Sequence, residues 1–469
     1  MKYYNKTLFL DQFTPVSIYA KVKDIFKDEI TFLFESTVNS ADGNFSYIII
    51  GDRERVWHKD KKSFYKNENG DIKQIQDDPF EFLKDYYKKL DSKIFKDISN
   101  ELNIGLVDGF IGNIGYDMVC EFEPTLKPYM SDLKDTLNIA DCDLIRPKMV
   151  LGFSHKTSKL VIYTAMNSME KYIDIIEQSL YTAYEFLPLK KATLHDEGNF
   201  AFSKEQFFDM VAKSKEMIKS GDVFQILMAN RFTQKASVDH LSFYRALRSK
   251  NPSPYLFLLQ YEDFSIAGSS PEVMVRLTDG HILLRPIAGT RKRGKTLQRD
   301  LEMEEELIND PKERAEHIML IDLGRNDVGR VAKRGTVEVT DLMRIEKYSH
   351  VMHIVTDVEA IIDEKYDMFD LFKATFTAGT MTGAPKIRAM QLIAKFEGIK
   401  RGFYSGSIGY FGFDGNMDSA ITIRTTLLKD DEVIFQAGAG VVADSIPELE
   451  YLEVQNKLAA NIATLKDLA

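Results

Sequence analysis

Short apolar runs with irregular spacing are the feature that most constrains how this chain can fold. Runs at residues 45–50 and 160–163, bounded by lysine-rich and aspartate-rich turns, predict strands. In the second half, predicted strands at 283–287, 406–413, 420–426 and 432–437 lie between segments with helical periodicity. Their spacing lacks the regular strand-helix-strand rhythm of a parallel sheet. We therefore predict an α+β fold with large, mostly antiparallel sheets flanked by helices.

A helix start near residue 203 marks a predicted boundary between two regions. Ser203 has the character of an N-cap, and Gln206 completes a capping box with it. A polar stretch at 189–199 precedes this helix, which we expect to end near Gly221 and to lead into a buried strand at 223–232. The sequence thus predicts an N-terminal region at 1–195 and a second region at 196–469.

Composition and charge narrow the class of function. The chain has 469 residues, 44% of them hydrophobic, which is enough for a large core. Its net charge of -10 and the lack of a Lys/Arg-rich block argue against a nucleic-acid or anionic-membrane partner. No apolar run approaches about 18 residues, the start does not resemble a signal peptide, and only two cysteines occur. We expect a cytoplasmic protein without a membrane segment that acts on a small molecule.

Two predicted helices each place a pair of glutamates on one face, because residues three apart on a helix are neighbours. The pairs are Glu313/Glu316 and Glu450/Glu453. One helix is expected to start at 310–311 and the other at 445–448, where the spacing fits a capping box with proline in the first turn. A bound cation would offset the repulsion within each pair, and magnesium prefers such oxygen ligands. The alternative is a solvated acidic face.

Glycine-rich segments at 378–386 and 436–445 suit an anionic ligand, since small residues let backbone amides approach it. Arg424, in the strand-like segment ITIRTT, and Lys457 add positive charge. The alternatives are ordinary turns and, for Glu453 with Lys457, a surface ion pair of about 0.3–0.5 kcal/mol.

Together these motifs become specific. The sequence resembles the chorismate-utilising enzyme family over nearly its whole length, in ordered segments that include GSSPE, RPIAGTRKRG, GTMTGAPK and RGFYSGSIGYF. The densest resemblance spans residues 203–457. It implies a sandwich-like core of antiparallel sheets, with a regulatory and structural region at 1–195 and a chorismate-binding catalytic region at 196–469. The implied activity is that of a magnesium-dependent lyase, which converts chorismate and ammonia to anthranilate and pyruvate for tryptophan biosynthesis.

The resemblance also implies roles for individual residues. Glu316 and Glu453 match the family's magnesium ligands, with Glu313 and Glu450 as supports. Glu272 matches the general acid that protonates the departing hydroxyl at ring carbon 4. The other matching positions are His353 and Thr380 beside the ring, His353 being linked with pyruvate elimination, and Tyr404, Arg424, Gly438, Ala439, Gly440 and Lys457 around the substrate's side chain and carboxylate. Gln225 is also predicted to be catalytic.

Two positions indicate which reaction of the family this chain performs. Members that add water to the ring have lysine where this chain has Gln225, so isochorismate and salicylate synthases are disfavoured. Aminodeoxychorismate synthases of the folate branch usually have a lysine nucleophile where this chain has Ala288. Three other interpretations stay open: the aminodeoxychorismate synthase of the folate branch, a catalytically silent scaffold subunit, and a generic acidic metal-binding protein.

The resemblance finally implies two partners. Neither Cys120 nor Cys142 lies in a context expected of a glutaminase nucleophile, so a separate glutamine amidotransferase subunit would supply ammonia. L-Tryptophan is implied as a feedback inhibitor outside the catalytic cleft. The residues matching its site are Glu35, Ser36, Asn251, Pro254, Tyr255 and Leu256, the last standing where many relatives have methionine.

Overall fold

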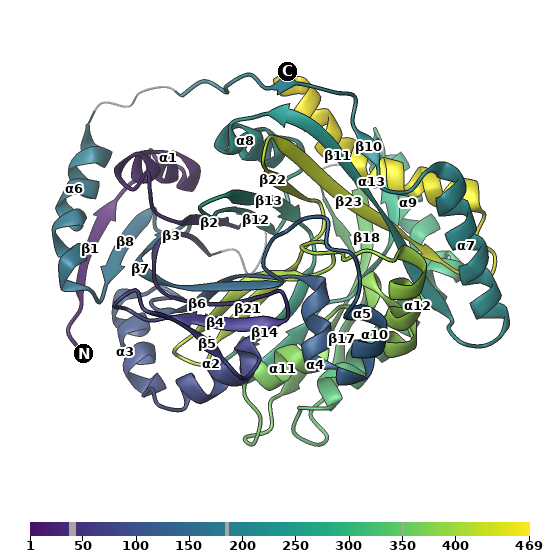
Figure 1. Cartoon of the computed structure of the whole chain (residues 1–469), viewed down its shortest axis with the longest axis horizontal. Helices are drawn as coiled ribbons and strands as arrows, with labels where there is room; N and C mark the ends of the chain where they lie inside the picture. Colours follow the sequence, from purple (N-terminus) through teal and green to yellow (C-terminus); the bar gives the residue numbers. More distant parts are fainter. Residues whose placement is uncertain (37–43, 183–186, 349–350) are drawn as a thin grey trace.

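The computed structural model describes residues 1–36, 44–182, 187–348 and 351–469. Strands and helices fill most of these ranges, and every pairing between named strands is antiparallel (Figure 1). The predicted α+β class with large antiparallel sheets is thereby confirmed. The pairings form two series of strands that share β3 (Phe45–Lys59) and β7 (Cys142–Ser154).

The first series of strands contains β23 (Glu432–Val441), which holds the glycine-rich segment that begins at residue 436. Its order is β1 (Tyr4–Phe9), β8 (Lys159–Thr164), β7, β3, β2 (Thr31–Glu35), β12 (Tyr255–Gln260), β13 (Phe264–Ser270), β22 (Thr425–Lys429), β23 and β11 (Gln225–Ser237). Three short strands also pair with β11: β9 (Thr193–Leu194), β10 (Asn199–Phe200) and β19 (Gly383–Ala384).

The second series of strands continues from β3 and β7 to β18 (Val351–Ile361). Its order is β5 (Ile72–Ile75), β4 (Lys62–Lys66), β3, β7, β6 (Gly109–Ile114), β20 (Ser407–Gly412), β21 (Met417–Ile421), β14 (Val273–Thr278), β15 (His281–Leu284) and β18. Strands β16 (Ile287–Lys292) and β17 (Glu338–Lys347) pair with β18 from either side.

Helices cover the outer faces of both series. The helices are α1 (Pro15–Ile25), α2 (Pro79–Tyr87), α3 (Ser92–Leu102), α4 (Val119–Phe122), α5 (Lys127–Met130), α6 (Glu170–Tyr181), α7 (Lys204–Lys219), α8 (His240–Lys250), α9 (Leu297–Asn309), α10 (Pro311–Gly329), α11 (Met368–Thr375), α12 (Lys386–Glu397) and α13 (Pro447–Leu468). Helix α8 packs on β13 and α13 on β23, whereas α2 and α11 pack on β3 and β14 of the second series (Figure 1).

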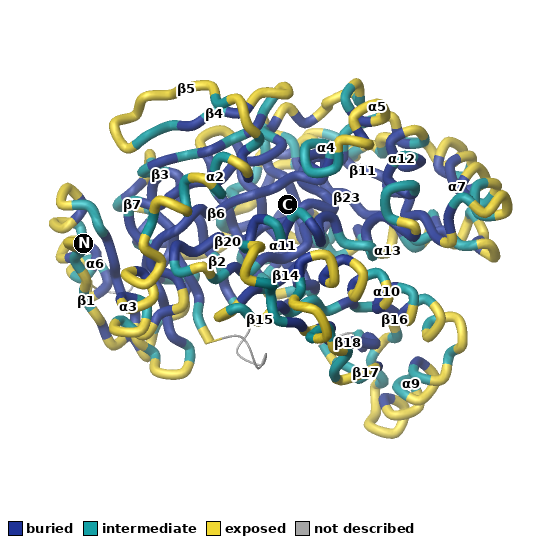
Figure 2. Tube along the Cα trace, turned by 90° about the horizontal axis from the view of Figure 1, so that it is seen from below, coloured by how far each residue is buried: buried dark blue, intermediate teal, exposed yellow. Residues whose placement is uncertain are grey.

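One hydrophobic cluster extends from Leu8 to Leu468 and fills the space inside these layers. Strands β16, β17 and β18 with α9 lie together at one end of the molecule, where a second, small cluster forms around Leu307 and Ile354 (Figure 2). The boundary predicted near residue 195 stays a prediction. Strands from its two sides pair with each other, β2 with β12 and β6 with β20.

Local signals placed several elements correctly. Ser203 caps α7 and forms the predicted capping box with Gln206, and the helix ends at Lys219, before Gly221. The strand expected at 223–232 is β11. Asp310 caps α10, with Pro311 in its first turn. Pro447 likewise opens α13, but the expected capping box there is wrong, because the N-cap is Ile446 and its side chain accepts no hydrogen bond.

Two predicted strands are each two strands. The segment 283–287 is divided between β15 and β16 by Arg285 and Pro286, since proline has no N–H to continue a ladder. The segment 420–426 is divided between β21 and β22, because the chain leaves the second series at Ile421 and enters the first at Thr425. Arg424 therefore lies in this crossing, with a left-handed φ of 52°, and not in a strand.

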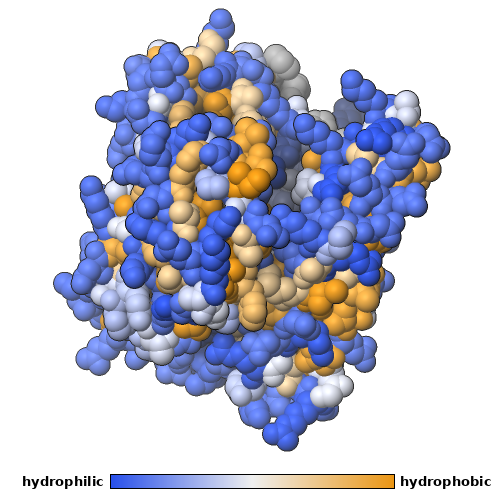
Figure 3. Space-filling view, turned by 90° about the vertical axis from the view of Figure 1, so that its right-hand side faces the viewer, coloured by the Kyte–Doolittle hydropathy of each residue, from blue (hydrophilic) through white to orange (hydrophobic). Residues whose placement is uncertain are grey.

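A helix that spans a membrane must be both long and apolar. No helix in the described ranges is long and apolar enough to cross a membrane. Figure 3 shows one face, where hydrophilic side chains surround separate hydrophobic patches and a notch hollows the surface at upper right.

Candidate active site

The site is built where two segments cross between the strand series. Glu272 lies between β13 and β14, and Arg424 lies between β21 and β22. The two crossings are hydrogen-bonded to each other, because the Ile421 N–H donates to the Glu272 carbonyl at 3.0 Å and the Ser269 N–H donates to the Arg424 carbonyl at 3.2 Å. The topology thus holds the backbones of Glu272 and Arg424, which are distant in sequence, in neighbouring crossings.

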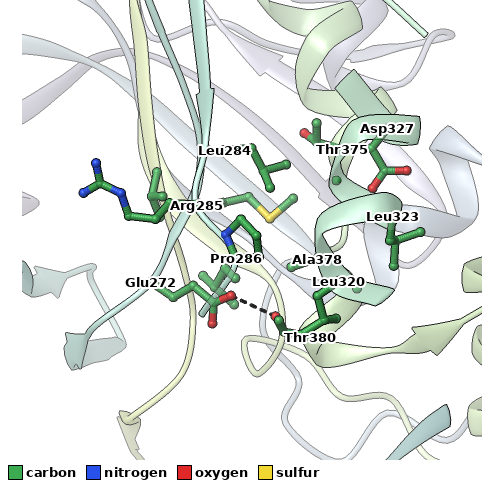
Figure 4. Close-up of a pocket in the computed structure, with 15 residues that line it drawn as sticks. Glu272, Leu284, Arg285, Pro286, Leu320, Leu323, Asp327, Thr375, Ala378 and Thr380 are labelled. Carbon is green, nitrogen blue, oxygen red and sulfur yellow. Dashed lines mark hydrogen bonds between the residues drawn. The ribbon is translucent and has the colours of Figure 1, made fainter. Parts of the chain in front are cut away.

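Glu272, the predicted general acid, is 6% exposed. The Thr380 hydroxyl, in the short 3-10 turn Gly379–Met381, donates to Glu272 Oε1 at 3.0 Å (Figure 4). Burial raises the pKa of Glu272 to about 8, although Thr380 and the backbone N–H of Ile287 partly oppose this shift. Glu272 is therefore protonated at neutral pH, as a general acid must be.

A small cavity lies behind this carboxyl group, and its walls explain the shift. Leu284, Pro286, Leu320 and Leu323 line it beside Glu272, so little water reaches the carboxylate (Figure 4). Its volume of about 30 Å³ is about the space of one water. This cavity therefore explains the acid's environment and is not the space that a substrate ring would fill.

The glycine segment at 438–440 lies in β23 and not in a turn, which corrects the expectation from sequence. Strand β22 pairs only with residues 432–435 of β23, so the edge beyond them has no strand partner in the described part of the chain. The Gly438 carbonyl accepts a hydrogen bond of 2.9 Å from Lys457 Nζ, so its backbone faces away from β11. Gly440, two residues on, faces the same way. These backbone N–H groups and Lys457 form a cradle suited to a carboxylate.

His353 lies on β18, 9% exposed, and its ring orientation is fixed. Nδ1 lies 2.9 Å from the Gly289 carbonyl and 3.1 Å from the Thr290 hydroxyl. Since a carbonyl only accepts, Nδ1 carries the proton and Nε2 keeps its lone pair in the neutral ring. Burial lowers the pKa of His353, which keeps the ring neutral and Nε2 able to accept a proton.

Arg424 and Tyr404 contribute a cation and a phenol. Among the described residues, no carboxylate forms an ion pair with the Arg424 guanidinium, and burial lowers its pKa. Tyr404 is 3% exposed, and burial raises its pKa, so the phenol stays protonated. A guanidinium without a carboxylate partner is suited to an anionic ligand.

Glu316 on α10 and Glu453 on α13 lie close enough for their charges to interact. Burial raises the pKa of Glu316, and the charges of Glu313 and Glu453 raise it further. Each glutamate already has a protein partner: Gln225 Nε2 donates to Glu316 at 3.0 Å, Arg291 pairs with Glu313 at 3.1 Å, and Lys457 pairs with Glu453 at 2.7 Å. Glu450 accepts a hydrogen bond from Ser445.

Whether these carboxylates can hold magnesium depends on their chemistry. Within the ranges that the structure describes, no three acidic, histidine or cysteine side chains already stand close enough to hold a metal. The donor set still fits, because hard oxygen ligands that repel one another are what magnesium neutralises. The predicted ligands Glu316 and Glu453, with Glu313 and Glu450, thus remain a prediction that this arrangement supports.

The residues predicted to bind tryptophan gather where β2 meets β12. Glu35 pairs in register with Leu256, next to Tyr255 and Pro254, and Ser36 follows at the end of β2. Glu35 is buried, with the Tyr244 hydroxyl at 2.5 Å and Arg248 Nε at 2.9 Å. The backbone carbonyl of Asn251 accepts a hydrogen bond from Ser269 of β13, the strand that leads to Glu272. The strand order thus joins this cluster to the candidate active site.

Comparison with known proteins identifies the class that this fold and site define. A family model described as chorismate binding enzyme matches residues 33–463, and the chain belongs to that family. Within the family the chain is similar to proteins named anthranilate synthase component 1. It is 40% identical to the one from Aquifex aeolicus, covering 97% of this chain and 92% of that one. It is 41% identical to the one from Acinetobacter calcoaceticus, covering 97% and 93%.

Solved structures agree with this assignment. The structure of anthranilate synthase component I from Streptococcus pneumoniae matches with a TM-score of 0.77 at 31% identity, over 91% of this chain and 94% of that chain. The menaquinone-specific isochorismate synthase from Escherichia coli matches with a TM-score of 0.73 at 17% identity, over 99% and 94%, which shows the shared fold alone.

Proposed function

We propose that this chain is the chorismate-binding subunit of an anthranilate synthase. It would convert chorismate and ammonia to anthranilate and pyruvate for tryptophan biosynthesis, in the cytoplasm. The observation that carries the proposal is Glu272, a buried carboxyl group with a pKa of about 8 at the crossing of the two strand series. The names of the similar proteins support the same reaction.

The predicted residues would supply the groups that both steps of this reaction need. Hydroxide is a poor leaving group, so protonation by Glu272 would let the ring hydroxyl depart as water. Lys457 and the backbone N–H groups of Gly438 and Gly440 would hold one carboxylate, and Arg424 with Tyr404 would hold the enolpyruvyl side chain. His353 Nε2 would take the ring proton as pyruvate leaves.

Gln225 supports ammonia as the nucleophile. Neutral ammonia is nucleophilic enough to attack without a base, whereas water is a far weaker nucleophile and would need a base to remove its proton. Gln225 is a neutral amide bonded to Glu316, and Ala288 provides no amine nucleophile. These residues favour the proposal over isochorismate, salicylate or aminodeoxychorismate synthesis.

Glu316 and Glu453 would hold a magnesium ion, with Glu313 and Glu450 supporting them. The bound ion would supply positive charge for the substrate's ring carboxylate. Magnesium would also replace the mutual repulsion of these carboxylates by attraction.

A separate glutamine amidotransferase would supply the ammonia. Cys142 is fully buried and Cys120 is half-buried, and burial raises both thiol pKa values, that of Cys120 to about 11. Neither thiol is therefore an activated nucleophile of the kind that glutamine hydrolysis requires. The description of the relatives as component 1 fits a second component.

The test is to incubate the purified chain with chorismate, magnesium and ammonium salts at raised pH and to follow anthranilate fluorescence and pyruvate. We expect equal amounts of the two products, and none when glutamine replaces ammonium. Glu272→Gln, which keeps the shape but cannot donate an acidic proton, is the control and should be inactive. Aminodeoxychorismate or isochorismate as the sole product would refute the proposal.

A further inference from the structure

Arg401 is buried in the interior although arginine is usually a surface residue. It is 1% exposed and lies between α12 and β20, three residues before Tyr404. Its guanidinium pairs with Glu397 at 2.8 Å and 2.5 Å. The same guanidinium donates to the carbonyls of Met381 and Leu227, each at 2.9 Å.

These contacts stand where a neighbouring strand would otherwise be. On the outer edge of β11, β19 pairs only with Gln225 and Ile226, and β10 pairs only with Phe232 and Thr233. Between them, Arg401 binds the Leu227 carbonyl and Glu397 accepts from the Ala229 N–H at 2.9 Å. The ion pair therefore satisfies backbone groups that an edge strand leaves free.

The opposite side of the same residues carries the candidate carboxylate cradle. In register, Leu227 lies across from Gly440 and Ala229 lies across from Gly438. Because the backbone groups of Leu227 and Ala229 bind the ion pair, they do not hydrogen-bond to β23. In such non-hydrogen-bonded residue pairs the two strands approach most closely, with Cα atoms about 4.5 Å apart. A shift of β11 at the ion pair is therefore passed directly to the cradle.

Two further contacts join the ion pair to the site. Met381 follows Thr380, whose hydroxyl binds Glu272. The Arg401 guanidinium also lies 5.9 Å from the centre of the Tyr404 ring and 4.8 Å from that of Tyr116. One buried group thus contacts the supports of the acid, the cradle and the phenol.

We infer that Arg401 and Glu397 form a positioning pair, which holds the Thr380 turn, the Gly438–Gly440 cradle and Tyr404 at the spacing that chorismate requires. The pair touches no reacting atom. The inference rests on the proposed function only in its choice of chorismate as the ligand. A buried ion pair is not by itself strong support for stability, so a role in geometry explains its retention better.

The test compares Arg401→Lys with Arg146→Lys. Arg146 is a matched control, because it is also a buried arginine, paired with Glu54 and Asp108 at 2.7 Å each, but it lies in the N-terminal half. Chorismate is titrated into each protein with magnesium by calorimetry, and thermal melting measures the loss of stability. Both variants should lose stability, and only Arg401→Lys should weaken chorismate binding, by about tenfold, the effect of one lost buried hydrogen bond.

Glu397→Gln is the second variant, because it keeps the shape of the side chain if Arg401→Lys fails to fold. It should weaken binding in the same direction. Chorismate binding equal to wild type in a folded Arg401→Lys or Glu397→Gln protein would overturn the inference. A wild-type chain that binds chorismate but makes no anthranilate would instead refute the proposed function, since the positioning role is judged on binding alone.

Discussion

Replacing Thr380 with valine tests how the acid is tuned, because it removes one hydroxyl and almost no volume. The lost hydrogen bond is the one of 3.0 Å to Glu272 Oε1, which favours the ionised carboxylate. A hydrogen bond to a charged group contributes about 1.5–3 kcal/mol, and one pKa unit corresponds to about 1.4 kcal/mol. The pKa of Glu272 should therefore rise from about 8 by about one to two units.

The sign of the effect on activity follows from the proposed role of Glu272 as the general acid. Only protonated Glu272 can donate, so kcat/KM should fall as pH rises through about 8 in the wild type. In Thr380→Val this decline should move about one to two pH units upward, even if the maximum rate is lower. The assay is anthranilate fluorescence across pH, with ammonium adjusted so that free ammonia stays constant.

Thr375→Val is the matched control. Thr375 lines the same cavity, but its hydroxyl donates to the carbonyls of Leu371 and Phe372 within α11 and not to Glu272. Its alkaline decline should coincide with that of the wild type. A decline that stays in place or moves downward in Thr380→Val would show that this hydroxyl does not set the proton affinity of Glu272.

Further predictions concern the carboxylates and the inhibitor. Glu316→Gln and Glu453→Gln should each lower magnesium-dependent turnover by about 100-fold or more, because amides are poorer ligands for a hard cation. The control is Glu338→Gln, at an exposed residue, which should leave turnover unchanged. Near-normal turnover in either of the first two variants would contradict the metal site. Between its ordinary pKa of 4.5 and about 8, native Glu272 keeps a proton that the unfolded chain releases, so stability should fall as pH rises through this window. The melting temperature of Glu272→Gln should therefore exceed that of the wild type near pH 9 and equal it near pH 4. Equal melting temperatures at both pH values would argue against a buried neutral acid. Ser36→Phe should relieve inhibition by tryptophan and leave uninhibited turnover unchanged, and a wild type insensitive to millimolar tryptophan would remove the assigned site.

The sequence predicts those parts of the site that rest on local signals. The capping box at Ser203, the cap at Asp310 and the proline at Pro447 locate helices to within a few residues. Because residues three apart on a helix share a face, the glutamate pairs on α10 and α13 follow from spacing alone. The prediction that these pairs form one site comes from the resemblance to the family.

Local sequence patterns do not predict long-range topology. The alternation in ITIRTT continues through the point where the chain passes from β21 to β22, since a strand pattern does not specify its sheet. The crossing at Arg424 was therefore predicted as a strand. Arg401 shows the same limit. Arg401 is the first residue of the family segment RGFYSGSIGYF, but only the fold shows that its guanidinium is buried between β11 and the Thr380 turn.

The pairing of β2 with β12 and of β6 with β20 has a consequence for synthesis on the ribosome. The first strand of each pair is made long before its partner, so its edge has unpaired N–H and C=O groups in the meantime. At about 5–20 residues per second, the wait for β12, roughly 220 residues after β2, is about 10–40 s. During that time the nascent N-terminal half offers open sheet edges to other chains. Crowded polysomes and overexpression should therefore favour aggregation at this stage, and a fragment that ends near residue 195 would keep these edges open permanently.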